Sequence, residues 1–117
     1  MATEIYKIEK QGDVSIMTLI LDDILHDENE KLMKSFDTLL NEGNKKIILD
    51  LSTTNYVSSL ILASLVYMLK RAKDGGGNLV FCSVKNRVKE IMSVTNLDKV
   101  FDITETREEA LKKVNKK

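Results

Sequence analysis

The fold is decided by residues 45–73, which read KKIILDLSTTNYVSSLILASLVYMLKRAK. A short isoleucine-rich run near the start of this stretch is bounded by lysines on one side and polar residues on the other. Such a run is typical of a buried central strand, which we expect over residues 47–51. From Leu60 to Lys73 the chain is mainly apolar and contains no glycine or proline. That length predicts a helix, because it exceeds the usual length of a strand.

A polar loop and a pair of serines join these two elements. Ser58 and Ser59 follow the loop and come just before the predicted helix. This order places a hydroxyl at a helix N-terminus, beside the carboxyl end of a strand, where open α/β sheets form their sites. A serine there also caps a helix, and capping alone explains one of the two. The pattern therefore leaves two interpretations: a serine with a functional role, or a serine that only caps the helix.

Length and composition predict one compact domain spanning residues 1–117. The chain has 18 basic and 18 acidic residues, and 43% of its residues are hydrophobic. The balanced charge gives no reason to expect nucleic acid or an anionic membrane surface as a partner. The N-terminus lacks the apolar run of a secretion signal, and the most apolar segment, 57–69, is too short to span a bilayer. We expect a cytoplasmic protein.

The remaining elements follow from apolar periodicity and from turn residues. Gly12-Asp13 predicts a hairpin turn, and Thr106 to Glu109 has the spacing of a capping box. The expected strands are 4–9, 14–21, 47–51, 79–82 and 100–103, and the expected helices are 27–41, 60–73, 83–93 with Ser83 as its cap, and 106–114. This order predicts an α/β fold, a mixed sheet of about five strands with about four helices packed mainly on one face.

The only cysteine, Cys82, and the only histidine, His26, are a conceivable nucleophile and base. No pattern brings them together, and Cys82 lies in an apolar strand, where cysteine usually behaves as a small hydrophobic residue. One cysteine also excludes an intramolecular disulfide and a cysteine-rich metal site. We expect no enzyme activity, although a small hydrolase or transferase using Cys82 or Ser58 is a rival hypothesis.

Two other clusters have structural explanations. The glycines at 75–77 follow a helix and precede a strand, which is the order of a helix C-cap and the reverse of a phosphate loop. A group of acids begins the first helix without the spacing of a calcium loop, and acids are favoured there by the helix dipole. These acids are Asp22, Asp23, Asp27, Glu28 and Glu30. We therefore expect no metal and no cofactor.

The helix after the two serines carries more apolar surface than one buried stripe requires. Its stripe consists of Ile61, Leu65, Met68, Leu69 and Ala72. Further apolar residues extend it most of the way around the helix, namely Leu60, Leu62, Ala63 and Val66. The surplus indicates that the N-terminal part of the helix meets a partner, with deep burial of the whole helix as the competing account.

These residues together resemble a known family. The run IILDLS at 47–52, the aromatic Tyr56, and Ser58-Ser59 heading an apolar helix are similar to the STAS domain of anti-sigma factor antagonists. The likeness continues through GGGNLVFC at 75–82, VKEIM at 88–92, LDKVF at 97–101 and EEAL at 108–111. With weaker agreement in the first forty residues, it covers nearly the whole chain.

The resemblance implies a small domain that binds an anti-sigma factor, often a serine kinase, and so frees a sigma factor. In such domains the kinase phosphorylates a serine at the N-terminus of the second helix, which ends the interaction, and a phosphatase restores it. Carried over by position, the target is Ser58, with Ser59 as the fallback. The sequence departs from the family motif at Val57, where an acid is usual, and at Leu60, where glycine is usual.

We expect the partner surface to combine the loop with the start of the helix. It comprises Thr53, Thr54, Asn55, Tyr56, Ser58, Ser59, Leu62, Ala63 and Val66. Charged substitution at Leu62 or Ala63 is expected to weaken binding with little loss of stability. A rival of the same fold is a STAS module in a signalling scaffold, or one that senses a small ligand without a phosphorylation switch.

Overall fold

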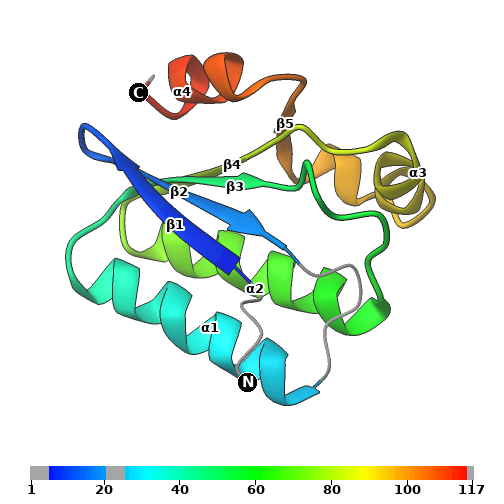
Figure 1. The fold of residues 1–117 in the computed structure, drawn as a ribbon, viewed down its shortest axis with the longest axis horizontal. Helices are drawn as coiled ribbons and strands as arrows, with labels where there is room; N and C mark the ends of the chain where they lie inside the picture. The colour runs from blue at the N-terminus through cyan, green and yellow to red at the C-terminus, as the bar shows by residue number, and fades with distance from the viewer. Residues whose placement is uncertain (1–5, 21–25, 116–117) are drawn as a thin grey trace.

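A computed structural model describes residues 6–20 and 26–115 and contains one five-stranded sheet flanked by four α-helices (Figure 1). The strands are β1 (Tyr6–Gln11), β2 (Val14–Leu19), β3 (Lys46–Asp50), β4 (Asn78–Cys82) and β5 (Asp102–Thr104). The helices are α1 (His26–Asn41), α2 (Ser59–Asp74), α3 (Asn86–Val94) and α4 (Arg107–Asn115), with a short 3₁₀ turn at Leu97–Lys99. The predicted order of elements and the α/β fold class are confirmed.

The sheet is mixed, and its strands lie in the order β1-β2-β3-β4-β5. β1 and β2 form an antiparallel hairpin closed by Gly12, whose φ of +63° suits the tight turn. The other strands run parallel, with Ile48 of β3 opposite Ile16 of β2 and Val80 of β4. β3 is therefore the central strand, as its unbroken apolar run predicts.

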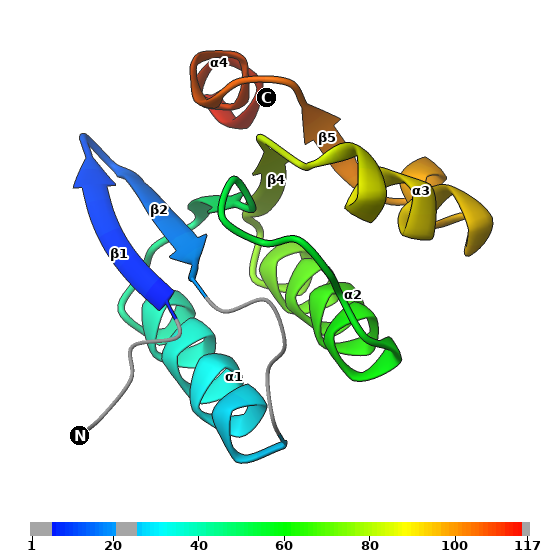
Figure 2. The same cartoon turned by 45° about the vertical axis from the view of Figure 1, so that its right-hand side comes forward.

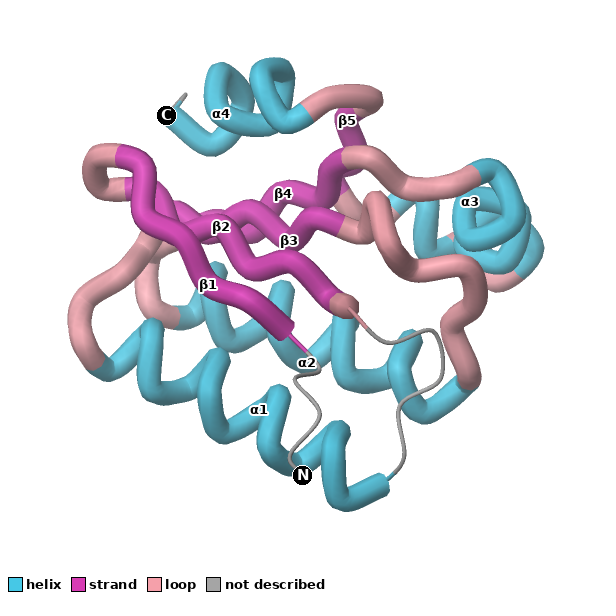
Figure 3. The backbone as a smooth tube through the Cα atoms, in the orientation of Figure 1, coloured by secondary structure: helices cyan, strands magenta, loops and turns pink. Residues whose placement is uncertain are grey.

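Helices cover both faces of the sheet, in three layers (Figures 1 and 3). α1 and α2 lie side by side on one face, where α3 adds Val88 and Met92 to the same core (Figure 2). α4 lies alone on the opposite face and closes a smaller core with Ala110 and Val114. Alternate residues of β3 serve the two cores, because neighbouring side chains of a strand point to opposite faces. Packing mainly on one face is confirmed.

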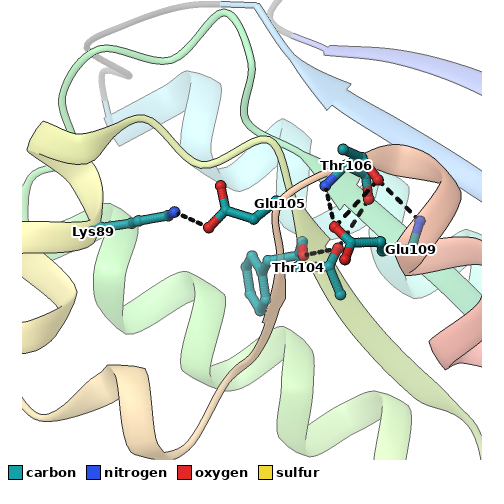
Figure 4. A network of polar contacts seen from close by, with 6 residues as sticks. Lys89, Thr104, Glu105, Thr106 and Glu109 are labelled. Carbon is teal, nitrogen blue, oxygen red and sulfur yellow. Dashed lines mark hydrogen bonds and ion pairs between the residues drawn. The ribbon is translucent and has the colours of Figure 1, made fainter.

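Local capping chemistry explains where α4 begins, but not where α3 begins. The capping box of α4 is present: Glu109 N donates to Thr106 Oγ1 at 3.1 Å, and Thr106 N donates to Glu109 Oε1 at 3.1 Å (Figure 4). The expected cap at Ser83 is wrong. α3 begins at Asn86 with Lys85 at its N-cap, and Ser83 has a φ of +56°. Val84 turns into the core, so Val84 and Lys85 lie between Ser83 and the first residue of the helix.

The glycine run ends α2, as predicted. Gly75 is the C-cap, and Gly76 has a φ of +80°. A Cβ added at Gly77 would lie 2.3 Å from the carbonyl oxygen of Lys45, so only glycine fits where this turn crosses the start of β3.

The last strand is shorter than expected and begins later. Val100 and Phe101, predicted to open it, follow the 3₁₀ turn at Leu97–Lys99 instead, and Phe101 N donates to Leu97 O at 2.9 Å. The Phe101 ring is buried beside Phe81, with 4.6 Å between ring centroids. An apolar run therefore signalled burial correctly but not strand conformation.

Candidate functional site

Ser58 occupies the N-cap of α2. Its backbone is extended, with φ −83° and ψ 170°, and its Oγ accepts a hydrogen bond from Ile61 N at 3.3 Å. Its carbonyl oxygen accepts from Leu62 N at 2.9 Å, which begins the helical pattern. The side chain of Ser58 is half-buried. The capping role is confirmed, and the hydroxyl stands where a helix dipole is positive.

Ser59 is the first residue of α2 and is exposed. Val57, on the other side of Ser58, is 2% exposed and belongs to the main core. The residue before the serine therefore anchors the loop by burying its side chain. An acid at this position would be buried in the same place, unless the loop changed its conformation.

The loop between β3 and α2 is held at three places. At its start, Asp50 Oδ1 accepts from Ser52 N at 2.8 Å. In its middle, Thr53 and Thr54 donate from their hydroxyls to Leu19 O, at 2.5 and 3.3 Å. Farther along, Lys85 Nζ at the N-cap of α3 donates to Asn55 Oδ1 at 2.5 Å. The end of β2 and the start of α3 thus fix the path that presents Ser58.

The residues expected at the partner surface differ in exposure. Those that are exposed are Thr53, Asn55, Tyr56, Ser59, Ala63 and Val66. Thr54 is 2% exposed, because its side chain turns toward Leu19. Leu62 is 8% exposed and packs in the main core. The expectation that Leu62 presents an exposed side chain, which charge could replace without loss of stability, is therefore wrong.

The burial of Leu62 follows from the neighbours of α2. This helix contacts α1 through the side that carries Ser64, whereas Leu62, two residues earlier, lies on nearly the opposite side of the helix and packs in the main core. Between the helices, Ser64 Oγ donates to Asn29 Oδ1 at 2.7 Å. Deep burial, the competing account of the apolar surplus, thus explains Leu62, whereas Leu60 and Val66 are each 38% exposed.

Two shallow hollows lie next to the serines. One, of about 320 Å³, runs between α1 and α2 and is lined by Met33, Leu60, Ala63, Ser64 and Tyr67. The other, of about 610 Å³, lies between the loop and α3 and is lined by Tyr56, Arg87, Glu90, Ile91, Val94 and Thr95. The start of α2 is therefore bordered by exposed aromatic and aliphatic side chains, which suits contact with another protein.

Asp50 and Arg107 form an ion pair that the sequence reasoning missed. Asp50 Oδ2 accepts from Arg107 Nη2 at 2.8 Å, and Glu9 Oε2 lies 3.7 Å from Arg107 Nη1. Burial raises the pKa of Asp50, but hydrogen bonds from Arg107 and Ser52 outweigh burial and leave that pKa below its ordinary value. An acid that ends a buried strand was the available signal, since a buried carboxylate needs a partner.

Cys82 has the properties of a core residue. Its side chain is fully buried, and burial together with the nearby charge of Asp50 raises the pKa of its thiol to about 11. Nucleophilic cysteines show the opposite shift. The side chain of His26 lies outside the described residues, as do Asp22, Asp23 and the side chains of Asp27 and Glu28. No group of three potential metal ligands occurs among the residues that the structure does describe.

Within the described ranges, no helix has the length and apolar character needed to cross a membrane. A family model described as the STAS domain matches residues 6–110. The chain belongs to the STAS domain family. Ser58 and the loop before it therefore lie in a STAS domain, as the resemblance implied.

Two relatives from Thermotoga are similar to this chain over most of their length. A Thermotoga neapolitana protein is 39% identical over 92 residues, which cover 77% of this chain and 81% of the relative. A Thermotoga maritima protein is 37% identical over 95 residues, which cover 80% and 84%. Both carry the name "putative anti-sigma factor antagonist".

Solved structures of similar proteins have the same fold. A crystal structure from Thermotoga maritima, described in the same words, has a TM-score of 0.83 and 31% identity, and covers 95% of both chains. Unphosphorylated SpoIIAA, an anti-sigma factor antagonist, has a TM-score of 0.77 at 15% identity and covers 93% of this chain and 95% of its own. The SpoIIAA likeness supports the fold alone.

Proposed function

We propose that this STAS domain is a cytoplasmic anti-sigma factor antagonist. It binds an anti-sigma factor of the serine kinase type and so releases a sigma factor, without catalysis by the chain itself. The Thermotoga relatives support the general role through their names and identity. The observation that carries the proposal is the half-buried hydroxyl of Ser58 at the N-cap of α2, bordered by exposed Tyr56 and Leu60.

The partner surface we propose is the exposed part of the predicted set. It combines the loop residues Thr53, Asn55 and Tyr56 with the helix residues Ser58, Ser59, Leu60, Ala63 and Val66. Apolar and aromatic side chains at the centre of such a surface supply most of the binding free energy. Leu60 is exposed where the family usually has glycine, so it adds apolar contact area.

Phosphorylation of Ser58 is the proposed off-switch, and a phosphatase reverses it. A phosphate adds a charge of roughly −2 at the positive end of the α2 dipole, which favours the anion and leaves the fold intact. The phosphate instead weakens the contact with the partner. A hydrated dianion beside Tyr56 and Leu60 must lose water when the partner approaches, and that loss costs several kcal/mol unless a cation meets it.

The buried Val57 changes how a kinase would recognise this serine. An acid before the target would offer charge to a kinase, whereas Val57 points into the core. Recognition therefore relies on the path of the loop, which Lys85 and the end of β2 hold in place. Ser59, exposed at the next position, is the fallback site.

The test is affinity capture from the native cytoplasm with and without ATP, followed by mass spectrometry of the captured protein and of Ser58. The wild type and Ser58→Ala should capture an anti-sigma factor, and ATP should release it from the wild type alone. Ser58→Asp should capture little. The control is Gln11→Glu, which adds one negative charge at an exposed position at the opposite end of the sheet. Capture of no anti-sigma factor by the wild type would refute the proposal.

A further inference from the structure

α3 has two faces, and the described residues, 6–20 and 26–115, cover only one of them. Val88 and Met92 are buried in the main core. The residues at 87, 90, 91, 94 and 95 recur at helical spacing and form a second stripe. Val94 is 82% exposed, more than any other large hydrophobic residue in the described ranges. This second stripe lines the hollow of about 610 Å³ together with Tyr56.

The charges of this stripe have no partner within the described chain. Arg87 and Glu90 lie one helical turn apart, and neither forms an ion pair with any residue in 6–20 or 26–115. On another side of the same helix, Lys89 does pair with Glu105, at 2.6 Å (Figure 4). The stripe thus combines one unpaired cation, one unpaired anion and exposed apolar side chains.

We propose that a second copy of this chain occupies the stripe. A two-fold axis that crosses α3 between residues 87 and 90 sets the two helices antiparallel. Arg87 then lies opposite the partner's Glu90, and Glu90 opposite the partner's Arg87, because a two-fold contact pairs the same surface with itself. Val94, displaced from the axis along the helix, is directed toward the hollow beside the partner's Tyr56.

The charge pattern favours a second copy over an unrelated protein. A stripe with one charge of each sign, one turn apart, is complementary to itself in the antiparallel arrangement, and each like-charge pair is kept apart. A partner of one dominant charge would leave either Arg87 or Glu90 opposed by a like charge. One two-fold axis therefore gives both Arg87 and Glu90 a partner of opposite charge.

The size of the stripe sets the strength of the contact. α3 has nine residues, which corresponds to a length of about 13 Å. Such a helix, with the hollow beside it, buries an area at the low end of specific interfaces, so association is weak and depends on concentration. Tyr56 also belongs to the proposed anti-sigma surface, so self-association and partner binding compete, although the self-association does not depend on that function.

Sedimentation equilibrium between about 10 µM and 1 mM tests the proposal, since weak contacts dissociate in this range. The average mass of the wild type should rise from 13.3 kDa toward twice that value. Arg87→Glu, with two acids in the stripe, and Glu90→Arg, with two bases, should each stay monomeric. An equimolar mixture of the two variants should form a heterodimer, because each acid then meets a base.

Lys112→Glu, which reverses a charge at an exposed position on α4, is the matched control and should associate like the wild type. Thermal midpoints of all variants should stay close to that of the wild type, because the changed side chains are exposed and each change in charge costs at most about 1 kcal/mol. A wild type that stays at 13.3 kDa up to the highest concentration overturns the proposal. It is also overturned if either single variant associates like the wild type, or if the mixture stays monomeric.

Discussion

Asp50 Oδ2 accepts a hydrogen bond from Arg107 Nη2 at 2.8 Å, and this pair joins α4 to the end of the central strand. The other carboxylate oxygen, Oδ1, accepts from Ser52 N at 2.8 Å and so starts the loop that leads to Ser58. Asp50 is 4% exposed. One buried carboxylate thus connects the lone helix on one face with the candidate site at the carboxyl edge.

Replacing Asp50 should therefore cost stability. Asp50→Asn removes the nearer of the two carboxylates beside Arg107 and should lower the free energy of unfolding by about 1.5–3 kcal/mol, the usual contribution of a hydrogen bond to a charged group. The loss of stability is measured by urea unfolding of Asp50→Asn, Arg107→Gln and the double variant. The double variant should lose less than the sum of the two single losses. A strictly additive result would show that the pair contributes nothing as a pair.

The same pair makes stability depend on pH in the acid range. The folded pKa of Asp50 lies below its ordinary value of 3.8, so its contribution is complete above that pH. The contribution disappears as the pH falls through the folded pKa, because the unfolded chain takes up the proton first. The stability difference between the wild type and Asp50→Asn should shrink below pH 3.8. A constant difference would contradict the assignment.

Leu62 and Ala63 are adjacent but should respond oppositely to charge. Leu62→Asp places a carboxylate in the main core and should lower stability by more than about 3 kcal/mol. Ala63→Asp, at an exposed position one residue later, should change it by less than about 0.5 kcal/mol and should weaken partner binding. Thermal unfolding of both variants measures these two changes in stability. Similar losses at both positions would contradict the orientation of α2.

The contrast between Leu62 and Ala63 shows where sequence reasoning ends. Periodicity predicted α2 and its main stripe, because one helix face must be buried. It could not predict Leu62, because that burial depends on how α2 packs in the main core, which segments distant in sequence complete. Val57 is similar: a single apolar residue in a polar loop gives no periodic pattern, and only the fold shows that it is buried.

Two glycines of the same turn should differ sharply. A Cβ at Gly77 meets Lys45 O at 2.3 Å, so Gly77→Ala forces backbone movement and should cost about 1–3 kcal/mol or more. At Gly75 the nearest atom to an added Cβ is Arg71 O at 3.6 Å, an ordinary contact. Gly75→Ala should therefore be neutral or slightly stabilising. The two variants are compared by their denaturant midpoints. Equal losses would show that the approach of the added Cβ to Lys45 O is not the cause.

The thiol of Cys82 should be inert in the folded protein. With its pKa raised to about 11, the thiolate fraction at pH 8 is roughly a hundredfold lower than for an ordinary cysteine, and burial adds a further barrier. Labelling with iodoacetamide should be slow in buffer and fast in urea. Rapid labelling of the folded chain would reopen the nucleophile hypothesis.

Chemistry at the ends of elements was more predictable than contacts across the fold. The capping box of α4, the glycine stop of α2 and the cap at Ser58 all depend on neighbours in sequence, and all three are present. The pairing of Asp50 with Arg107 joins residues 57 positions apart, so no local pattern contains it. The candidate site was found from the sequence because its serines lie at a helix start.

Phosphate on Ser58 should end partner binding without unfolding the domain. The most direct measurement is the dissociation constant of the captured anti-sigma factor for the chain phosphorylated at Ser58, compared with the unmodified chain. We expect the phosphorylated chain to bind about 100-fold more weakly or worse, equivalent to about 2.7 kcal/mol, with an unchanged thermal midpoint. Equal affinity of the two forms would contradict it and would leave Ser58 as a helix cap alone.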